Sequence, residues 1–124
     1  MSEAIGKTLW VIPEGYIPPK SHGPAPEMES HETACILNTG DEDANVEIFL
    51  YFSDREPAGP YRVRIPARRT KHLRFNSLRD PEPIPLGKDY SSVIRSDRPV
   101  VVQHTRLDSR QAEEALLSTI AYHP

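Results

Sequence analysis

Alternation of apolar and polar residues with a period of two runs through most of the chain and predicts β-strands. The clearest case is residues 45–53, where Val46, Ile48, Leu50 and Phe52 form one apolar face. The opposite face of this segment also carries large apolar side chains. We therefore expect both faces to be covered, one by a second sheet and the other by a subunit contact or a loop.

Residues 60–76 predict a hairpin whose surface is rich in arginine. Tyr61, Val63 and Ile65 alternate with two arginines, a break follows at residues 66–69, and a second alternating run completes the unit. A hairpin of this kind buries one face and leaves its guanidinium groups on the other. The same stretch concentrates positive charge in a chain whose net charge is −3.

The remaining pattern predicts more short strands and very little helix. Further strands are expected at residues 8–12, 32–38, 89–96, 100–107 and 117–122. We also expect a tight turn at residues 96–99 and a short helical turn from Ser109 onward, before the last strand. About eight short strands separated by turns predict an all-β fold, an antiparallel β-sandwich or a jelly-roll-like barrel.

Composition adds limits to this picture. The 124 residues suffice for one domain, which we place at residues 1–124. The 13 prolines suit short strands joined by stiff connections, because proline is excluded from helix interiors and central strand positions. Cys35 is the only cysteine, so an internal disulfide and a cysteine-cluster metal site are excluded. Its apolar neighbours favour a buried structural thiol.

The chain shows no secretory signal pattern and no apolar run near the roughly 20 residues that a membrane-spanning helix needs. We therefore expect a soluble, cytoplasmic protein that at most makes peripheral contact with a membrane receptor.

His31 and Glu32 are the first candidate site residues. Neighbours on a strand point to opposite faces, so a shared metal would also need His72 or His104 from another strand. The spacing of two histidines and a glutamate that is typical of metal-binding β-barrels is absent, and we expect no metal. The simpler interpretation is that His31 bonds a turn and Glu32 pairs with an arginine.

His104 and Arg106 share one face of a predicted strand that begins apolar and ends polar. Arginine offers a planar fork of donors for carboxylate, phosphate or sugar hydroxyl groups. This face is therefore a candidate contact for a ligand or a partner. The alternative is a structural ion-pair network with Glu47, Asp108 or Glu113.

The basic stretch contributes Arg68, Arg69 and His72 as candidates. It could be a solvated or subunit-facing surface, a protein-recognition surface, or a contact with nucleic acid through phosphate groups. RNA-binding platforms add exposed aromatic rings. Here Tyr61 and Phe75 fall on the predicted apolar faces, so that signature is missing.

Trp10 could form an aromatic wall for a sugar together with Tyr16, but a lone tryptophan in a first strand is more often a core residue. We find no glycine-flanked serine, no cysteine with a catalytic partner and no phosphate-binding glycine loop. The sequence thus predicts no catalytic residues, no cofactor and no enzyme activity.

Several longer motifs together resemble the soluble sensory rhodopsin transducer family. They are EGYIPP at 14–19, SHET at 30–33, Asn38 with GDEDA at 40–44, GPY at 59–61, PARRTKH at 66–72, VVQHTRLDSRQAE at 101–113 and STIAY at 118–122. The resemblance implies a small cytoplasmic β-sandwich that assembles as a homotetramer, binds the cytoplasmic side of a microbial sensory rhodopsin and relays the light signal. Contact with DNA and binding of a sugar-like ligand have also been proposed within this family.

We accordingly predict a non-enzymatic signalling adaptor whose basic hairpin or proline-rich loops contact the rhodopsin. The alternatives are a binding module for a sugar-like or anionic small molecule and a DNA-binding transcriptional regulator. The candidate ligand- or partner-binding residues are Trp10, Glu14, His31, Glu32, Arg68, Arg69, His72, His104 and Arg106.

Overall fold

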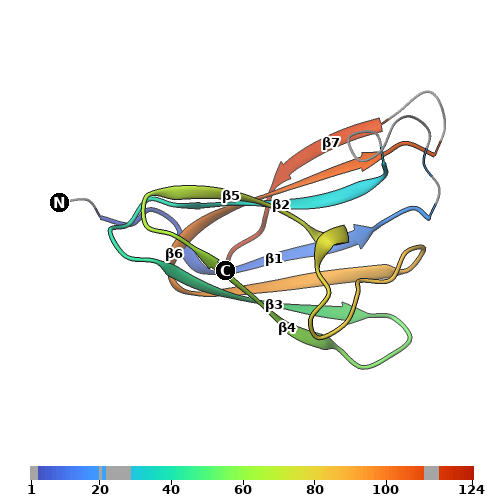
Figure 1. The fold of residues 1–124 in the computed structure, drawn as a ribbon, viewed down its shortest axis with the longest axis horizontal. Coiled ribbons are helices and arrows are strands. Elements are labelled where there is room, and N and C mark those ends of the chain that lie inside the picture. The colour runs from blue at the N-terminus through green and yellow to red at the C-terminus, as the bar shows by residue number, and fades with distance from the viewer. Residues whose placement is uncertain (1–2, 20, 22–28, 111–114) are drawn as a thin grey trace.

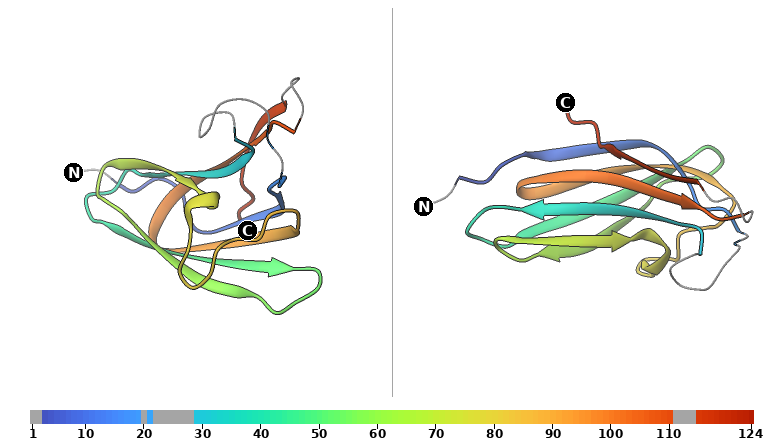
Figure 2. Two further views of the ribbon diagram at one scale, coloured as in Figure 1. Left: turned by 45° about the vertical axis from the view of Figure 1, so that its right-hand side comes forward. Right: turned by 90° about the horizontal axis from the view of Figure 1, so that it is seen from above.

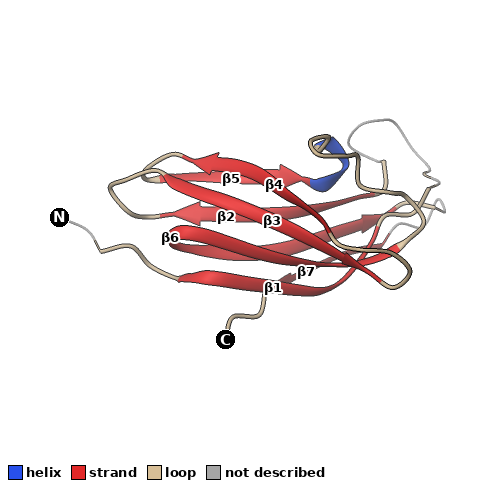
Figure 3. Ribbon diagram, turned by 90° about the horizontal axis from the view of Figure 1, so that it is seen from below, coloured by secondary structure: helices blue, strands red, loops and turns tan. Residues whose placement is uncertain are grey.

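A computed structural model of the chain describes residues 3–19, 21, 29–110 and 115–124, and these residues are almost entirely β-strand (Figure 1, Figure 3). The strands are β1 (Lys7–Tyr16), β2 (His31–Asn38), β3 (Ala44–Phe52), β4 (Ala58–Ile65), β5 (Arg69–Arg74), β6 (Asp89–Asp108) and β7 (Ala115–Ile120). A single turn of 3-10 helix, η1 (Phe75–Ser77), is the one helical element in the described residues. The predicted all-β class is confirmed.

The strands form a curled antiparallel sheet with two layers that share β6. Sheet A has the order β4-β3-β6-β1, and sheet B has the order β5-β2-β6-β7. Residues 90–96 of β6 pair with β3, and β1 pairs along β6 from Asp89 to Val100 with a register shift, whereas residues 101–108 pair with β2 and β7. The layers lie one above the other, and β6 passes from one to the other (Figure 1, Figure 2).

The core lies between the two layers and follows the predicted period of two. On β3, Val46, Ile48 and Leu50 are buried, as expected, and they face Ile36 and Val102 of sheet B. Fully burying one such side chain stabilises the fold by roughly 1.5–3 kcal/mol. The other face of β3 is half covered, with Tyr51 exposed.

The predicted hairpin at residues 60–76 is wrong. Both strands exist, but β4 pairs with β3 in sheet A, and β5 pairs with β2 in sheet B. Residues 66–68 carry the chain between the layers, and Arg68 adopts a left-handed backbone with a φ of 54°. The buried side chain of Asn38 fixes this crossing, because its amide group donates to the carbonyl oxygens of Ile65 (3.0 Å) and Glu42 (2.9 Å).

The predicted tight turn at residues 96–99 is also wrong. β6 runs unbroken through these residues and bends there from sheet A into sheet B (Figure 1). Ser96 is the last residue paired with β3, and Val101 is the first paired with β2. Pro99 lies between them, so its missing N–H removes no hydrogen bond from either ladder.

The C-terminal region also joins the two layers. The predicted helical turn falls largely on residues 111–114, outside the described residues, and β7 begins at Ala115. After β7 the chain crosses to sheet A, where Tyr122 and Val11 exchange two backbone hydrogen bonds of 3.0 and 2.7 Å. Within the described ranges, no helix is long and apolar enough to cross a membrane.

Candidate functional site

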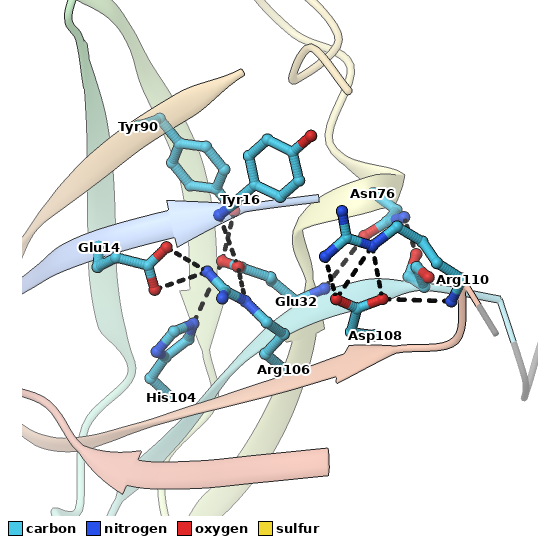
Figure 4. A network of polar contacts seen from close by, with 10 residues as sticks. Glu14, Tyr16, Glu32, Asn76, Tyr90, His104, Arg106, Asp108 and Arg110 are labelled. Atoms are coloured by element: carbon cyan, nitrogen blue, oxygen red, sulfur yellow. Dashed lines mark hydrogen bonds and ion pairs between the residues drawn. The ribbon is translucent and has the colours of Figure 1, made fainter. Parts of the chain in front are cut away.

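Glu32 is the centre of the most extensive polar network in the interior. Its position on β2 places it on the inner face, directly across from Arg106 of β6. Its Oε1 accepts from the Tyr90 hydroxyl (2.7 Å) and from His104 Nε2 (3.2 Å). Its Oε2 accepts from the Tyr16 amide (2.7 Å) and from Arg106 Nε (2.7 Å) (Figure 4). Four donors from β1 and β6 therefore converge on one fully buried carboxylate.

These donors determine the charge of Glu32. Burial alone raises the pKa of its carboxyl group, but the hydrogen bonds from His104, Tyr16, Tyr90 and Arg106 outweigh burial and hold the pKa below its ordinary value. Glu32 is consequently ionised at neutral pH. Burial, followed by the adjacent Glu32 charge, raises the pKa of Tyr90, which therefore keeps its proton and remains a donor.

Arg106 links this buried carboxylate to an exposed one. Its Nη2 contacts both carboxylate oxygens of Glu14 on β1, at 2.6 and 2.5 Å. The side chain of Arg106 is 17% exposed and that of Glu14 is 65% exposed. The cluster holds two carboxylates against one guanidinium group, so the arginine does not neutralise it.

A second polar cluster holds the start of β2 against the end of β6. The Ser30 hydroxyl accepts from the Ser109 amide (2.9 Å) and lies 3.2 Å from the Ser109 hydroxyl. Asn76 donates to the Ser30 carbonyl oxygen (3.0 Å) and accepts from the Glu32 amide (3.3 Å). These contacts hold the backbone around Glu32 in place.

An open cavity of about 310 Å³ lies between β1 and β7, beside this network. We call it the β1–β7 groove. Glu14 and His104 form its polar side, and its walls are mainly apolar. The groove is lined by Val11, Ile12, Pro13, Glu14, His104, Leu117, Thr119, Ile120, Ala121 and Tyr122.

A larger depression of about 690 Å³ lies over sheet A, away from Glu32. Its arginines include Arg62 and Arg64, which already pair with Glu47 (3.2 Å) and Asp43 (2.5 Å). These pairs are exposed and contribute little to a defined site. The Glu32 network with the adjacent groove is therefore the better candidate, although its cavity is smaller.

The structure brings together four of the residues singled out from the sequence and separates the others. Glu14, Glu32, His104 and Arg106 form one cluster. Trp10 is a core residue whose indole N–H donates to the Val100 carbonyl oxygen (2.9 Å).

The other candidates lie outside the cluster. His31 is half-buried, with Nδ1 2.7 Å from the Glu29 carbonyl oxygen. Arg68, Arg69 and His72 are exposed on and beside β5.

Sequence reasoning missed Tyr90, the donor that closes the network from the sheet A half of β6. The one signal for it was chemical, because a buried tyrosine hydroxyl usually needs a hydrogen-bond partner. Glu32 and His104 were also considered as ligands of one metal ion. They do lie in contact, but as hydrogen-bond partners of each other. Among the residues that the structure describes, no group of three or more His, Cys, Asp or Glu side chains is placed to hold a metal ion.

Fold and site together define a small antiparallel β-sandwich protein with a buried ion network beside an open groove. Residues 5–123 match the family described as "Anabaena sensory rhodopsin transducer", and the chain belongs to that family. This confirms the resemblance seen in the sequence motifs.

Two solved structures are similar over most of the chain. One is described as "Anabaena sensory rhodopsin transducer", with 64% sequence identity and a TM-score of 0.77, covering 84% of this chain and 100% of that chain. The other is described as "Crystal Structure of Thermotoga maritima 1070", with 39% identity and a TM-score of 0.84, covering 94% of each chain. No curated protein sequence gives a significant match.

Proposed function

We propose that this protein is a cytoplasmic, non-catalytic signalling adaptor that binds the cytoplasmic side of a microbial sensory rhodopsin and relays its light signal. The observation that carries the proposal is the family match over residues 5–123, together with 64% identity to a structure described as a sensory rhodopsin transducer. The fold supports it with an interior in which the buried carboxylate of Glu32 is bonded to His104 and Arg106.

The surface charges favour an adaptor over a DNA-binding protein. DNA binding depends on arginine and lysine side chains that neutralise phosphates. Here many exposed guanidinium groups already face carboxylates of the same chain, which weakens their field. The pairs are Arg62–Glu47, Arg64–Asp43, Arg68–Asp41, Arg74–Glu29 and Arg98–Glu42.

We further propose that the adaptor is a homo-oligomer, a tetramer as the family resemblance implies, that covers the outer face of sheet A. Phe49 and Val93 are neighbours on this face and are only half-buried, and Tyr51 is exposed beside them. A contiguous apolar surface of this kind suits a subunit contact. Light scattering should give the mass of four chains, and replacing Tyr51 by Glu should lower that mass.

Titration into a purified receptor tests the adaptor function. The protein should be titrated into the detergent-solubilised sensory rhodopsin of the same organism, followed by calorimetry and by flash photolysis. We expect saturable heat and an altered photocycle decay. An unrelated β-sandwich protein of similar net charge is the control. Absence of both signals with the folded protein would overturn the proposal.

A further inference from the structure

We infer that the β1–β7 groove and the free edge of β7 form the docking site for a basic, extended segment of the receptor. This inference rests on the proposed function and adds to it a location and a partner chemistry. Strand addition at an exposed sheet edge is a general way to bind an extended peptide, because the edge supplies backbone donors and acceptors.

The edge of β7 is unusually open for a natural sheet. β7 pairs only with β6 in the described part of the chain, so its other edge has no strand beside it there. Natural edge strands are commonly protected by lysine, proline or a bulge. The six residues of β7 include neither a charged residue nor a proline, and Leu116 and Ile120 are 69% and 60% exposed.

The charge beside this edge is negative. Glu14 lines the groove and is mostly exposed, and Asp89, also exposed, lines the adjoining cavity that Glu14 shares. Glu14 and the buried Glu32 together set two carboxylates against the one guanidinium group of Arg106. A lysine or arginine side chain would therefore be attracted to the Glu14 end while the apolar part of its segment covers Leu117 and Ile120.

A membrane receptor supplies this chemistry on its cytoplasmic side. Loops that face the cytoplasm carry an excess of lysine and arginine near the ends of the membrane-spanning segments. The basic stretch around β5 fits such a loop poorly, because like charges repel. The groove combines a free edge, apolar walls and negative charge in one place.

A charge-matched pair of variants tests the site on the receptor itself. Ile120→Lys and Ile120→Glu both remove the same exposed apolar side chain but add opposite charges. In calorimetry with detergent-solubilised rhodopsin, we expect Ile120→Lys to weaken Kd about tenfold or more, equivalent to about 1.4 kcal/mol, and Ile120→Glu to stay within about threefold of the wild type. Arg69→Ala, on β5, is the control and should bind as the wild type does.

Two outcomes would overturn the inference. One is wild-type binding by Ile120→Lys, with or without a loss in Arg69→Ala. The other is a change in oligomeric mass in Ile120→Lys, which would identify the edge as a contact between copies of this chain. Circular dichroism and thermal unfolding verify that each variant is folded.

A peptide experiment separates this inference from the proposed function. A synthetic peptide of alternating lysine and valine is titrated into the isotope-labelled full chain, and amide shifts are followed by NMR. We expect shifts on β7 and around Glu14, and none with the same peptide carrying glutamate in place of lysine. Shifts confined to β5, or no shifts, would refute the docking site even if rhodopsin binds. Shifts on β7 without rhodopsin binding would support the site and refute the adaptor function.

Discussion

Replacing Glu32 by Gln should be among the most damaging single-atom changes in the protein. The side chain keeps its shape but exchanges one carboxylate oxygen for an amide group that donates. Each oxygen of Glu32 now accepts from two donors, so the new amide nitrogen would face either Arg106 Nε and the Tyr16 amide or the Tyr90 hydroxyl and His104. Donors would then face donors in the interior.

The contacts of Glu32 set the size of the expected loss in unfolding free energy. Removing one member of a buried ion pair costs roughly 3–5 kcal/mol, because the other charge remains buried without compensation. Arg106 retains Glu14 as a partner, so we expect the lower end, about 3 kcal/mol. For a chain of this size, each kcal/mol lowers Tm by roughly 4 °C, giving a loss of about 12 °C.

Urea and thermal unfolding at pH 7, followed by circular dichroism, measure this loss. Glu14→Gln is the matched control, since it removes the exposed partner of the same guanidinium and should cost about 0–1 kcal/mol. A loss below about 1 kcal/mol in Glu32→Gln, or equal losses in both variants, would refute the idea that the buried carboxylate holds the network together.

The stability difference between the wild type and Glu32→Gln should also depend on pH. The pKa of Glu32 in the folded protein lies below its ordinary value of 4.5, so the charge contributes stability at pH values above 4.5. That contribution is lost as pH falls through the lowered pKa of the folded state. The stability difference between the wild type and Glu32→Gln should therefore be constant from pH 7 to about 5 and shrink below pH 4.5. A difference that persists unchanged at pH 2 would contradict this assignment.

Two further variants or probes test other parts of the structure. Asn38→Ala should cost about 2–3 kcal/mol in urea unfolding, because the buried carbonyl oxygen of Ile65 and the partly buried one of Glu42 lose their donor, whereas Asn45→Ala at an exposed site should cost less than half as much. Cys35 should react with iodoacetamide at pH 7.5 several-fold more slowly in the folded protein than in urea, because partial burial raises the pKa of its thiol; equal rates would contradict this.

The sequence was sufficient to find the strands but not to pair them. The alternation on β3 identified Val46, Ile48 and Leu50 as inward-facing, because the side-chain period of a strand is local. Pairing is a long-range property. β4 and β5 follow each other in sequence with a short break, which favours a hairpin, yet each finds its partner in a different layer.

The candidate site shows the same division between local and long-range information. His104 and Arg106 were recognisable as a polar end of an apolar strand face. Their contact with Glu32 depends on the register between β2 and β6, across 72 and 74 residues of sequence. Tyr90 lies at the other end of β6, and it joins them only because that strand bends between the layers.

The sharing of β6 by both sheets also has a consequence for protein synthesis. β1 is the first strand to leave the ribosome, but its strand partner is β6, which pairs with it from Asp89 to Val100. At about 5–20 residues per second, roughly 4–20 s pass before that partner is made. During this interval Trp10 and Ile12 have no sheet to cover them, and β3 can pair only with β4. Nascent chains stalled before residue 89 should therefore remain protease-sensitive and associate with chaperones, and protection should appear abruptly once β6 has emerged.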